Sequence, residues 1–310
     1  MIKQEDEGLH ASGSDTDWQE SVFLAWRDPV AGIGGDHRIG NEINLGVANM
    51  WCGVYTDSGS RFRLNAEGIP LERAENVKGL RCGPQRMFHD GRSLKFLLET
   101  DECNIDLDIT DMPLSEHWLE NTGVMLTSQS NHYDIHCTVK GTARVGDQTV
   151  EISGHGWRDH SWGVRKWGQI LHHRCFSGNF GEGYIFDFFS MLFANGTLVK
   201  GGRITEKGKR ESFDSFDFVV GMADDCLTSR SATVRGRRPG GQEFELNFDL
   251  ADGVVVQTRE YVGIEAVGAA RMAPGKEGFG YFALSSNARA GREFPVLALH
   301  SVLNNGLSRR

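Results

Sequence analysis

Hydrophobic and polar residues alternate along several short stretches of the chain. In residues 93–99, 103–110, 131–141 and 243–250 the side chains at every second position are apolar or small. A period of two residues is the pattern of a β-strand with one buried face. Stretches with the period of a long amphipathic helix are nearly absent, so the chain is predicted to be all-β.

Dipeptides that favour tight turns lie near these stretches. Asp90-Gly91, Asn195-Gly196 and Asp252-Gly253 tolerate the positive φ that a two-residue hairpin needs. Glycine is abundant, with 39 residues among 310, and the chain has 18 phenylalanines but only 7 prolines. This composition suits many strands joined by tight turns. We therefore expect short antiparallel strands in a sandwich or a barrel.

The length of the chain allows two domains, although no proline- or serine-rich linker separates them. The glycine-broken stretch 141–156 is the best candidate for a boundary. We predict a flexible tail over 1–17, which is acidic and rich in serine and glycine. A first barrel is predicted over 18–150 and a second over 151–310.

Charge and composition argue against several classes of protein. The formal net charge of -9 argues against a binder of nucleic acid or of anionic membranes, which needs clustered basic residues. The chain contains no run of 18 apolar residues, so no membrane span is predicted. Its polar start resembles no secretion signal, and we therefore expect a cytoplasmic protein. The six cysteines form no C-x-x-C pair and are expected to be buried thiols.

Candidate chemistry concentrates in the stretch SGHGWRDHSWGVRKWGQ, residues 153–169, which holds three tryptophans and two histidines. In an extended chain Trp157 and Asp159 share one face, whereas Arg158 and His160 point to the other. Burial beside an indole raises the pKa of a carboxyl group, because burial disfavours the charged form. Asp159 is therefore a candidate proton donor near neutral pH.

Two other interpretations of this stretch remain open. Arg158, Asp159 and His160 could form a buried ion-pair network that fixes geometry and takes no part in a reaction. A metal site needs at least three converging ligands, and His155 and His160 are five residues apart, on opposite faces of a strand. We predict no metal and no cofactor.

The sequence GHGWRDHSWGVR, with the earlier WRDPVAGIGGDHRIGNEINLG and the later GKEGFGYF, resembles the AttH-like and carotenoid 1,2-hydratase-like proteins. The resemblance spans nearly the whole chain. It implies two lipocalin-like (calycin-type) antiparallel β-barrels packed side by side, with an apolar ligand cavity. The family includes hydratases that protonate an alkene without a cofactor and cyclases that act on unsaturated intermediates. An acidic residue is the proton donor of those hydratases, and the position that matches the motif is Asp159, with His160 as its partner.

Together, the residues and the resemblance predict a cofactor-independent lyase or isomerase of the hydratase, dehydratase or cyclase type. Its partner would be a hydrophobic small molecule, terpenoid-like and unsaturated. Asp159 would be the general acid, His160 would orient or reprotonate it, and Arg158 would anchor the site. The residues expected to contact the substrate are Trp157, Trp162, Tyr184 and Trp51. A non-catalytic carrier of a lipid or pigment is the alternative, and a homo-oligomer is compatible with either.

Overall fold

The computed structural model describes residues 2, 4–71, 79–91, 93–113, 115, 117–118, 131–181, 183–213, 215–224, 229–257, 261–272, 275–287 and 305–309. Among these residues the only helices are short 3-10 turns, namely η1 (Gln4–Glu7), η2 (Ile43–Leu45) and η3 (Trp167–Gln169). Strands make up most of the rest, and every strand pair is antiparallel. The predicted all-β class is confirmed. No helix in the described part of the chain has the length and apolar character needed to cross a membrane.

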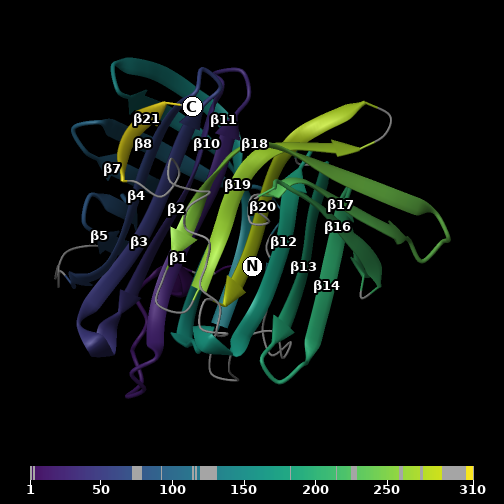
Figure 1. The fold of residues 1–310 in the computed structure, drawn as a ribbon, viewed down its shortest axis with the longest axis horizontal. Helices are drawn as coiled ribbons and strands as arrows, with labels where there is room; N and C mark the ends of the chain where they lie inside the picture. The colour runs from purple at the N-terminus through teal and green to yellow at the C-terminus, as the bar shows by residue number, and fades with distance from the viewer. Residues whose placement is uncertain are drawn as a thin grey trace. The chain divides into compact units, whose positions relative to one another are not determined.

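The chain divides into two compact units. Unit 1 comprises Met1–Lys166 and Asn304–Arg310, and unit 2 comprises Trp167–Leu303. Each unit contains one antiparallel sheet that curls into a half-barrel (Figure 1). The expectation of two lipocalin-like antiparallel β-structures is therefore confirmed.

The sheet of unit 1 runs in the order β21-β4-β3-β2-β1-β11-β10-β8-β7-β6-β5, and β9 pairs with β10. At its centre β1 pairs with β11, a strand far away in the sequence, so that Ser21 lies opposite Ser161. The strands of this sheet are β1 (Trp18–Asp28), β2 (Ile33–Glu42), β3 (Val47–Thr56), β4 (Ser60–Pro70), β5 (Gly79–Cys82), β6 (Gln85–His89), β7 (Leu94–Glu99), β8 (Cys103–Asp111), β9 (His117–Trp118), β10 (Asn131–Val145), β11 (Gln148–Val164) and β21 (Gly306–Arg309).

The sheet of unit 2 runs in the order β15-β14-β13-β12-β20-β19-β18-β17-β16. The pairing of β12 with β20 joins the first and last of its strands. Its strands are β12 (Ile170–Asn179), β13 (Tyr184–Phe193), β14 (Leu198–Glu206), β15 (Lys209–Phe213), β16 (Phe216–Met222), β17 (Ser229–Arg237), β18 (Glu243–Gln257), β19 (Tyr261–Met272) and β20 (Lys276–Asn287).

The core of unit 1 consists of the side chains that alternate inward along its strands. In β8 the buried residues recur at every second position, as the sequence predicts. Trp26 and Phe96 are completely buried in this core. Strands β8 and β10 approach so closely that a Cβ on Gly141 would lie 1.9 Å from the Asp106 carbonyl oxygen. Gly141 also has a φ of +151°, a conformation that other residues rarely adopt.

The core of unit 2 is rich in phenylalanine. Phe176, Phe186, Phe248 and Phe282 are completely buried, and the rings of Phe176 and Phe186 meet edge-to-face at 4.8 Å. Such ring pairs add to the stability gained by burial of apolar surface.

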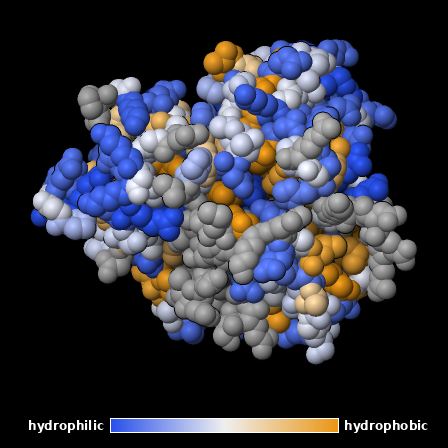
Figure 2. Space-filling view, turned by 180° about the vertical axis from the view of Figure 1, so that it is seen from behind, coloured by the Kyte–Doolittle hydropathy of each residue, from blue (hydrophilic) through white to orange (hydrophobic). Residues whose placement is uncertain are grey.

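On the face of the molecule in Figure 2, hydrophilic residues cover much of the described surface and hydrophobic residues form separate patches.

The predicted turns have different outcomes. Asn195-Gly196 connects β13 to β14, and Asp90-Gly91 lies in the connection from β6 to β7, each with a glycine at positive φ. The prediction for Asp252-Gly253 is wrong, because both residues lie inside β18. The pairing of β18 with β19 shifts register between Leu250 and Asp252, so an irregularity of a continuous strand resembles a turn in the sequence.

Two features of unit 1 bear on the site. Strand β11 runs without a break from Gln148 to Val164, so the motif expected to open the second barrel lies in the centre of the first sheet. Residues of the expected tail contact the core, as described below.

Of the cysteines, Cys52, Cys82, Cys103 and Cys137 are buried free thiols and Cys175 is partly exposed, whereas Cys226 lies outside the described residues.

Candidate functional site

Strand β11 carries the Arg-Asp-His sequence, and its pairing with β1 determines which way each side chain points. Arg158 lies opposite Leu24, and His160 lies opposite Val22, and both partners belong to the core of unit 1. Asp159 therefore points to the other side of the sheet, because successive side chains of a strand alternate. We call the two sides the core face and the opposite face of unit 1. The predicted separation of Asp159 from its two neighbours is confirmed.

On the core face Arg158 is at the centre of an ion-pair network. Its Nε and Nη2 atoms donate to the two carboxylate oxygens of Asp111 at 2.8 and 2.7 Å, and Nη2 also donates to Glu7 at 2.7 Å. Burial alone would lower the pKa of the guanidinium, but Asp111, Tyr133 and Glu7 raise it well above its usual value. Arg158 is thus a permanent cation that links β11 to β8 and to the N-terminal segment.

Next to this network, the carboxylate of Glu20 lies between two imidazoles. Glu20 is completely buried, and its Oε1 atom is 2.7 Å from His10 Nδ1 and 3.0 Å from His160 Nε2. Burial alone would raise the pKa of Glu20, but the hydrogen bonds of His10 and His160 lower it. The ring of Trp162 stacks on His10 at 3.8 Å, with an interplanar angle of 4°. His160 therefore has Glu20 as its acidic partner, whereas Asp159 lies on the opposite face.

On the opposite face Asp159 lies beside His132 and Asp134 of β10. His132 Nε2 is 2.8 Å from Asp134 Oδ1 and 3.5 Å from Asp159 Oδ2. Burial alone would lower the pKa of His132, but the two carboxylates raise it to about 9. Burial alone would raise the pKa of Asp159, but His132, Arg165 and Arg38 lower it. At neutral pH the imidazole therefore holds the proton and the carboxylate is charged.

The raised pKa that the sequence predicts for Asp159 is wrong in direction. The prediction rested on Trp157, which does share the opposite face with Asp159 and meets the Phe23 ring edge-on at 5.7 Å. An aromatic neighbour removes solvent, but a charged neighbour at hydrogen-bonding distance has the larger effect. That neighbour, His132, belongs to another strand and is brought close only by the register of β10 with β11.

The opposite face continues from Asp159 as a row of side chains across β1, β2 and β3. Phe23, Arg38 and Trp51 lie opposite one another in this row. The Arg38 guanidinium lies 4.8 Å from the centre of the Trp51 ring, a cation–π arrangement. Trp51 is only 5% exposed, and its indole N–H finds no hydrogen-bond acceptor among the described residues. A buried N–H of this kind is a potential donor to a ligand.

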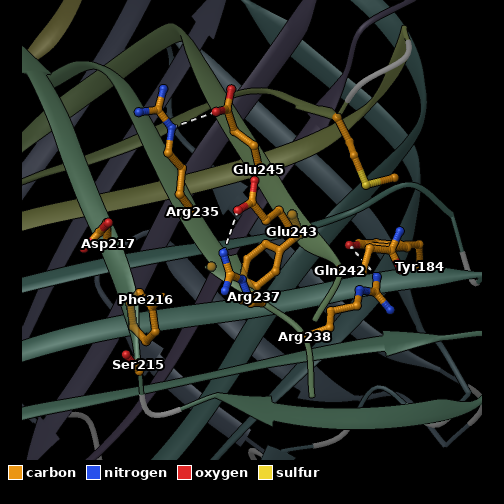
Figure 3. Close-up of a pocket in the computed structure, with 13 residues that line it drawn as sticks. Tyr184, Ser215, Phe216, Asp217, Arg235, Arg237, Arg238, Gln242, Glu243 and Glu245 are labelled. Atoms are coloured by element: carbon orange, nitrogen blue, oxygen red, sulfur yellow. Dashed lines mark hydrogen bonds and ion pairs between the residues drawn. The ribbon is translucent and has the colours of Figure 1, made fainter. Parts of the chain in front are cut away.

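Tyr184, the fourth residue expected to contact the substrate, belongs to unit 2. It lines a hollow of about 790 Å³. Its hydroxyl group accepts a hydrogen bond from Arg238 at 3.4 Å. Figure 3 shows the ion pairs Arg235–Glu245 and Arg237–Glu243 along the strands that border this hollow. Other lining residues are Phe216, Phe244, Asp217 and Met272.

The seven predicted site residues therefore fall into three places. Arg158, His160 and Trp162 lie on the core face of unit 1, Asp159, Trp157 and Trp51 lie on its opposite face, and Tyr184 lies in unit 2.

Sequence reasoning missed His132, Glu20, His10 and Glu7. Two of these have a signal in the sequence. His132 and Asp134 lie on one face of a recognisable strand, and Glu20 is the one charged residue of the run WQESVFLAW. Glu7 and His10 have none, because a polar segment resembles a tail unless its contacts are known.

Two groups of residues in the described part of the chain have ligand atoms within 4.8 Å of one another, as a metal ion would require. They are His10, Glu20 and His160 on the core face, and His132, Asp134 and Asp159 on the opposite face. In the second group the protonated imidazole already balances carboxylate charge. In the first group a completely buried carboxylate faces two imidazoles and also accepts from the backbone N–H of His10, at 3.0 Å from Oε2.

Solved structures share the fold of this chain. A protein assigned as AttH from Nitrosomonas europaea superposes with a TM-score of 0.71 at 13% identity, over 92% of this chain and 96% of that one. Kievitone hydratase from Nectria haematococca superposes with a TM-score of 0.62 at 8% identity, over 92% of this chain and 93% of that one. CghA gives 0.58 at 8% identity, over 89% and 90%. These similarities confirm the predicted resemblance at the level of the fold.

Sequence comparison gives a narrower result. None of the curated proteins matches this chain. A family model covers residues 3–288, which include the Arg-Asp-His motif, the row of side chains on the opposite face and the strands β1 to β20. The chain belongs to the family described as Domain of unknown function (DUF7064).

Proposed function

We propose that the chain is a hydratase-type lyase or isomerase that works by proton transfer at the opposite face of unit 1. The observation that carries the proposal is the imidazolium of His132, held between Asp134 and Asp159 next to a row of aromatic side chains. His132 and Asp159 keep 15% and 18% of their side chains exposed, although the Nε2 atom of His132 is itself covered. Asp159 keeps its predicted place in the site but changes its role, from proton donor to counter-ion.

The substrate class follows from the groups around the imidazolium. Phe23, Trp51 and Trp157 offer apolar rings, and π faces stabilise a nearby cation. These rings are 4–5% exposed, so an unsaturated, largely hydrophobic molecule enters only when they move apart, and the N–H of Trp51 then donates to one polar atom of it. A terpenoid-like skeleton is one member of this class.

Hydration can proceed in two proton-transfer steps. The Nδ1 proton of His132 moves to one carbon of the double bond, because Nε2 is covered and faces Asp134. The π electrons form the new C–H bond and leave a carbocation on the other carbon. Water then adds to the cation, and the proton that it loses returns to His132, which restores the imidazolium. Asp134 and Asp159 keep the imidazole protonated at neutral pH and offset the developing positive charge. If a carbon-bound proton is lost in place of water addition, the product is an isomer. If a second double bond of the substrate first attacks the cation, its π electrons form a C–C bond, and loss of a proton then gives a cycle.

Kievitone hydratase shares the fold, which supports a hydratase-type reaction. The second candidate is a non-catalytic carrier of a lipid or pigment. The hollow of about 790 Å³ in unit 2 supports it, because Tyr184, Phe216 and Phe244 contribute aromatic rings to a lining that otherwise consists largely of charged and polar residues.

The test compares the unmutated protein with His132→Gln, which keeps a hydrogen-bonding side chain but has no transferable proton. Each protein is incubated with the apolar fraction of a cell extract in H₂O and in D₂O, and the compounds are identified by mass spectrometry. His155→Gln, on the same sheet, is the matched control. We expect the unmutated protein and the control to convert a compound into one that is heavier by a water or equal in mass, with deuterium on carbon.

The variant should leave that compound unchanged. If all three proteins retain the same compound and alter nothing, the carrier function is favoured. If His132→Gln converts the compound as fast as the unmutated protein, the role of His132 is wrong.

A further inference from the structure

The most unusual charge arrangement outside the proposed reaction site is the buried carboxylate of Glu20 on the core face. Its only ion-pair partners in the described part of the chain are His10 and His160. Both imidazoles approach the same oxygen, Oε1. A completely buried carboxylate needs a positive charge beside it, since an isolated buried ion is very costly.

The second nitrogen of His160 indicates how this charge could be supplied. The hydroxyl of Tyr133 lies 3.4 Å from His160 Nδ1 and can accept its proton. In that tautomer the lone pair of Nε2 points at Glu20 Oε1 across 3.0 Å. Two electron-rich atoms at this distance repel each other, so either a proton on Nε2 or a metal cation has to lie between them. A histidine that gives its other N–H to a neighbouring oxygen is also the usual arrangement of a metal ligand.

The charges of the surrounding residues favour a cation as well. Glu7, Glu20 and Asp111 contribute three carboxylates to the network, whereas Arg158 contributes one guanidinium. The network therefore has two more carboxylates than guanidinium groups, and imidazoles such as His89 or a bound cation have to balance their charge. A single divalent cation balances this excess.

We propose that His10, Glu20 and His160 bind a zinc-type divalent cation that fastens the N-terminal segment to β1 and β11. Two imidazoles and one carboxylate are a ligand set that zinc uses, with a fourth position for water. Ligands of a tetrahedral zinc ion lie about 3.3 Å apart. Glu20 Oε1 therefore needs to move by only a few tenths of an ångström from His10 Nδ1 and from His160 Nε2, and all three ligand atoms lie within 4.8 Å of one another. Magnesium and calcium prefer oxygen ligands and fit this set less well.

The position of the three ligands gives the site its role. His10 comes from the segment before β1, Glu20 from β1 and His160 from β11. Trp162 holds the His10 ring in place by stacking on it. A cation bound here crosslinks three segments that are far apart in the sequence. It binds the folded chain and not the unfolded one, so it stabilises the fold.

The experiment measures Zn²⁺ binding to the full-length chain by calorimetry after treatment with a chelator. The variants are His10→Ala, Glu20→Gln and His160→Gln. His10→Ala is the decisive one, because it lies before the first strand and carries little risk to folding. His89→Ala is the matched control, since His89 also contacts the N-terminal segment, through Glu7, but is no ligand.

We expect one Zn²⁺ per chain and an affinity more than about 100-fold lower in His10→Ala, with no change in His89→Ala. Zn²⁺ should also raise the melting temperature of the unmutated protein and slow proteolysis before residue 18, and it should do neither in His10→Ala. Co²⁺ should give visible ligand-field bands without the charge-transfer band of a thiolate ligand. Two results would overturn the site: no Zn²⁺ bound by the unmutated protein, or binding that survives His10→Ala but is lost in His132→Gln.

Discussion

The charge of His132 leads to a prediction about stability that needs no substrate. In the folded chain the pKa of His132 is raised from 6.5 to about 9 by Asp134 and Asp159. A pKa raised by this amount corresponds to about 3 kcal/mol of stabilisation, at 1.36 kcal/mol for each pKa unit. Because the folded state binds the proton more tightly than the unfolded state, this stabilisation is fully present below pH 6.5. It is lost as the pH rises through 9.

The perturbation is His132→Gln, which removes the titrating group and keeps a polar side chain. The assay is urea unfolding of both proteins, followed by tryptophan fluorescence from below pH 6.5 to above pH 9. Six of the seven tryptophans precede residue 167, so the signal reports mainly on unit 1. Groups that titrate in the same way in both proteins contribute equally to the two unfolding free energies. The difference between these free energies therefore reports on His132.

We expect this difference to be largest below pH 6.5 and to fall by about 3 kcal/mol above pH 9. The same comparison can be made between Asp159→Asn and the double variant Asp159→Asn/His132→Gln. Their difference in unfolding free energy should fall by less between pH 6.5 and pH 9, because only Asp134 remains beside the imidazole. A difference that stays constant across the whole range would refute the reasoning. It would mean that folding does not raise the pKa of His132, and the proposed proton donor would lose its charge at neutral pH.

Three further predictions follow from contacts elsewhere in the chain. Arg158→Met should lower the unfolding free energy by about 3 kcal/mol, because it leaves the carboxylates of Glu7 and Asp111 without their cation, and Arg158→Lys should restore only part of the loss. Gly141→Ala should cost more than Gly91→Ala in urea unfolding, since both glycines have positive φ but only Gly141 has a carbonyl oxygen in the space of a Cβ. Iodoacetamide should label Cys175 first among the five described cysteines, because burial raises the pKa of Cys52 and raises that of Cys103 to about 12. Peptide mapping that finds Cys52 or Cys103 labelled first would contradict this prediction.

The strands could be predicted from the sequence, but their partners could not. Alternation in 93–99 or 131–141 is a local property and survives in β7 and β10. The pairing of β1 with β11 joins segments separated by most of unit 1, and nothing local announces it. The domain boundary was obscured for the same reason: glycines within β11 resemble a break in the sequence, although Gly154 and Gly156 let β11 lie close to the backbone of β1.

The charge state of the site depended on these long-range pairings. Trp157, two residues from Asp159, favoured a neutral acid when only local sequence was considered. His132, which sets the actual protonation state, comes from β10 and is placed by the register. The sequence predicts that Glu7 and His10 belong to a flexible tail. Their partners, Arg158 and Glu20, lie on strands β11 and β1, so these contacts can be recognised only once the fold is known.

The two interpretations of Arg158, Asp159 and His160 excluded each other only when the three residues were treated as one cluster. In a strand they belong to two faces, so a structural network and a reaction site can occupy adjacent positions. Arg158 and His160 hold buried carboxylates on the core face, where their loss removes stability. Asp159 stands on the opposite face beside His132 and the aromatic row. Substitutions along β11 should therefore alternate in effect: positions 158 and 160 should change stability first, and position 159 should change the proposed reaction first.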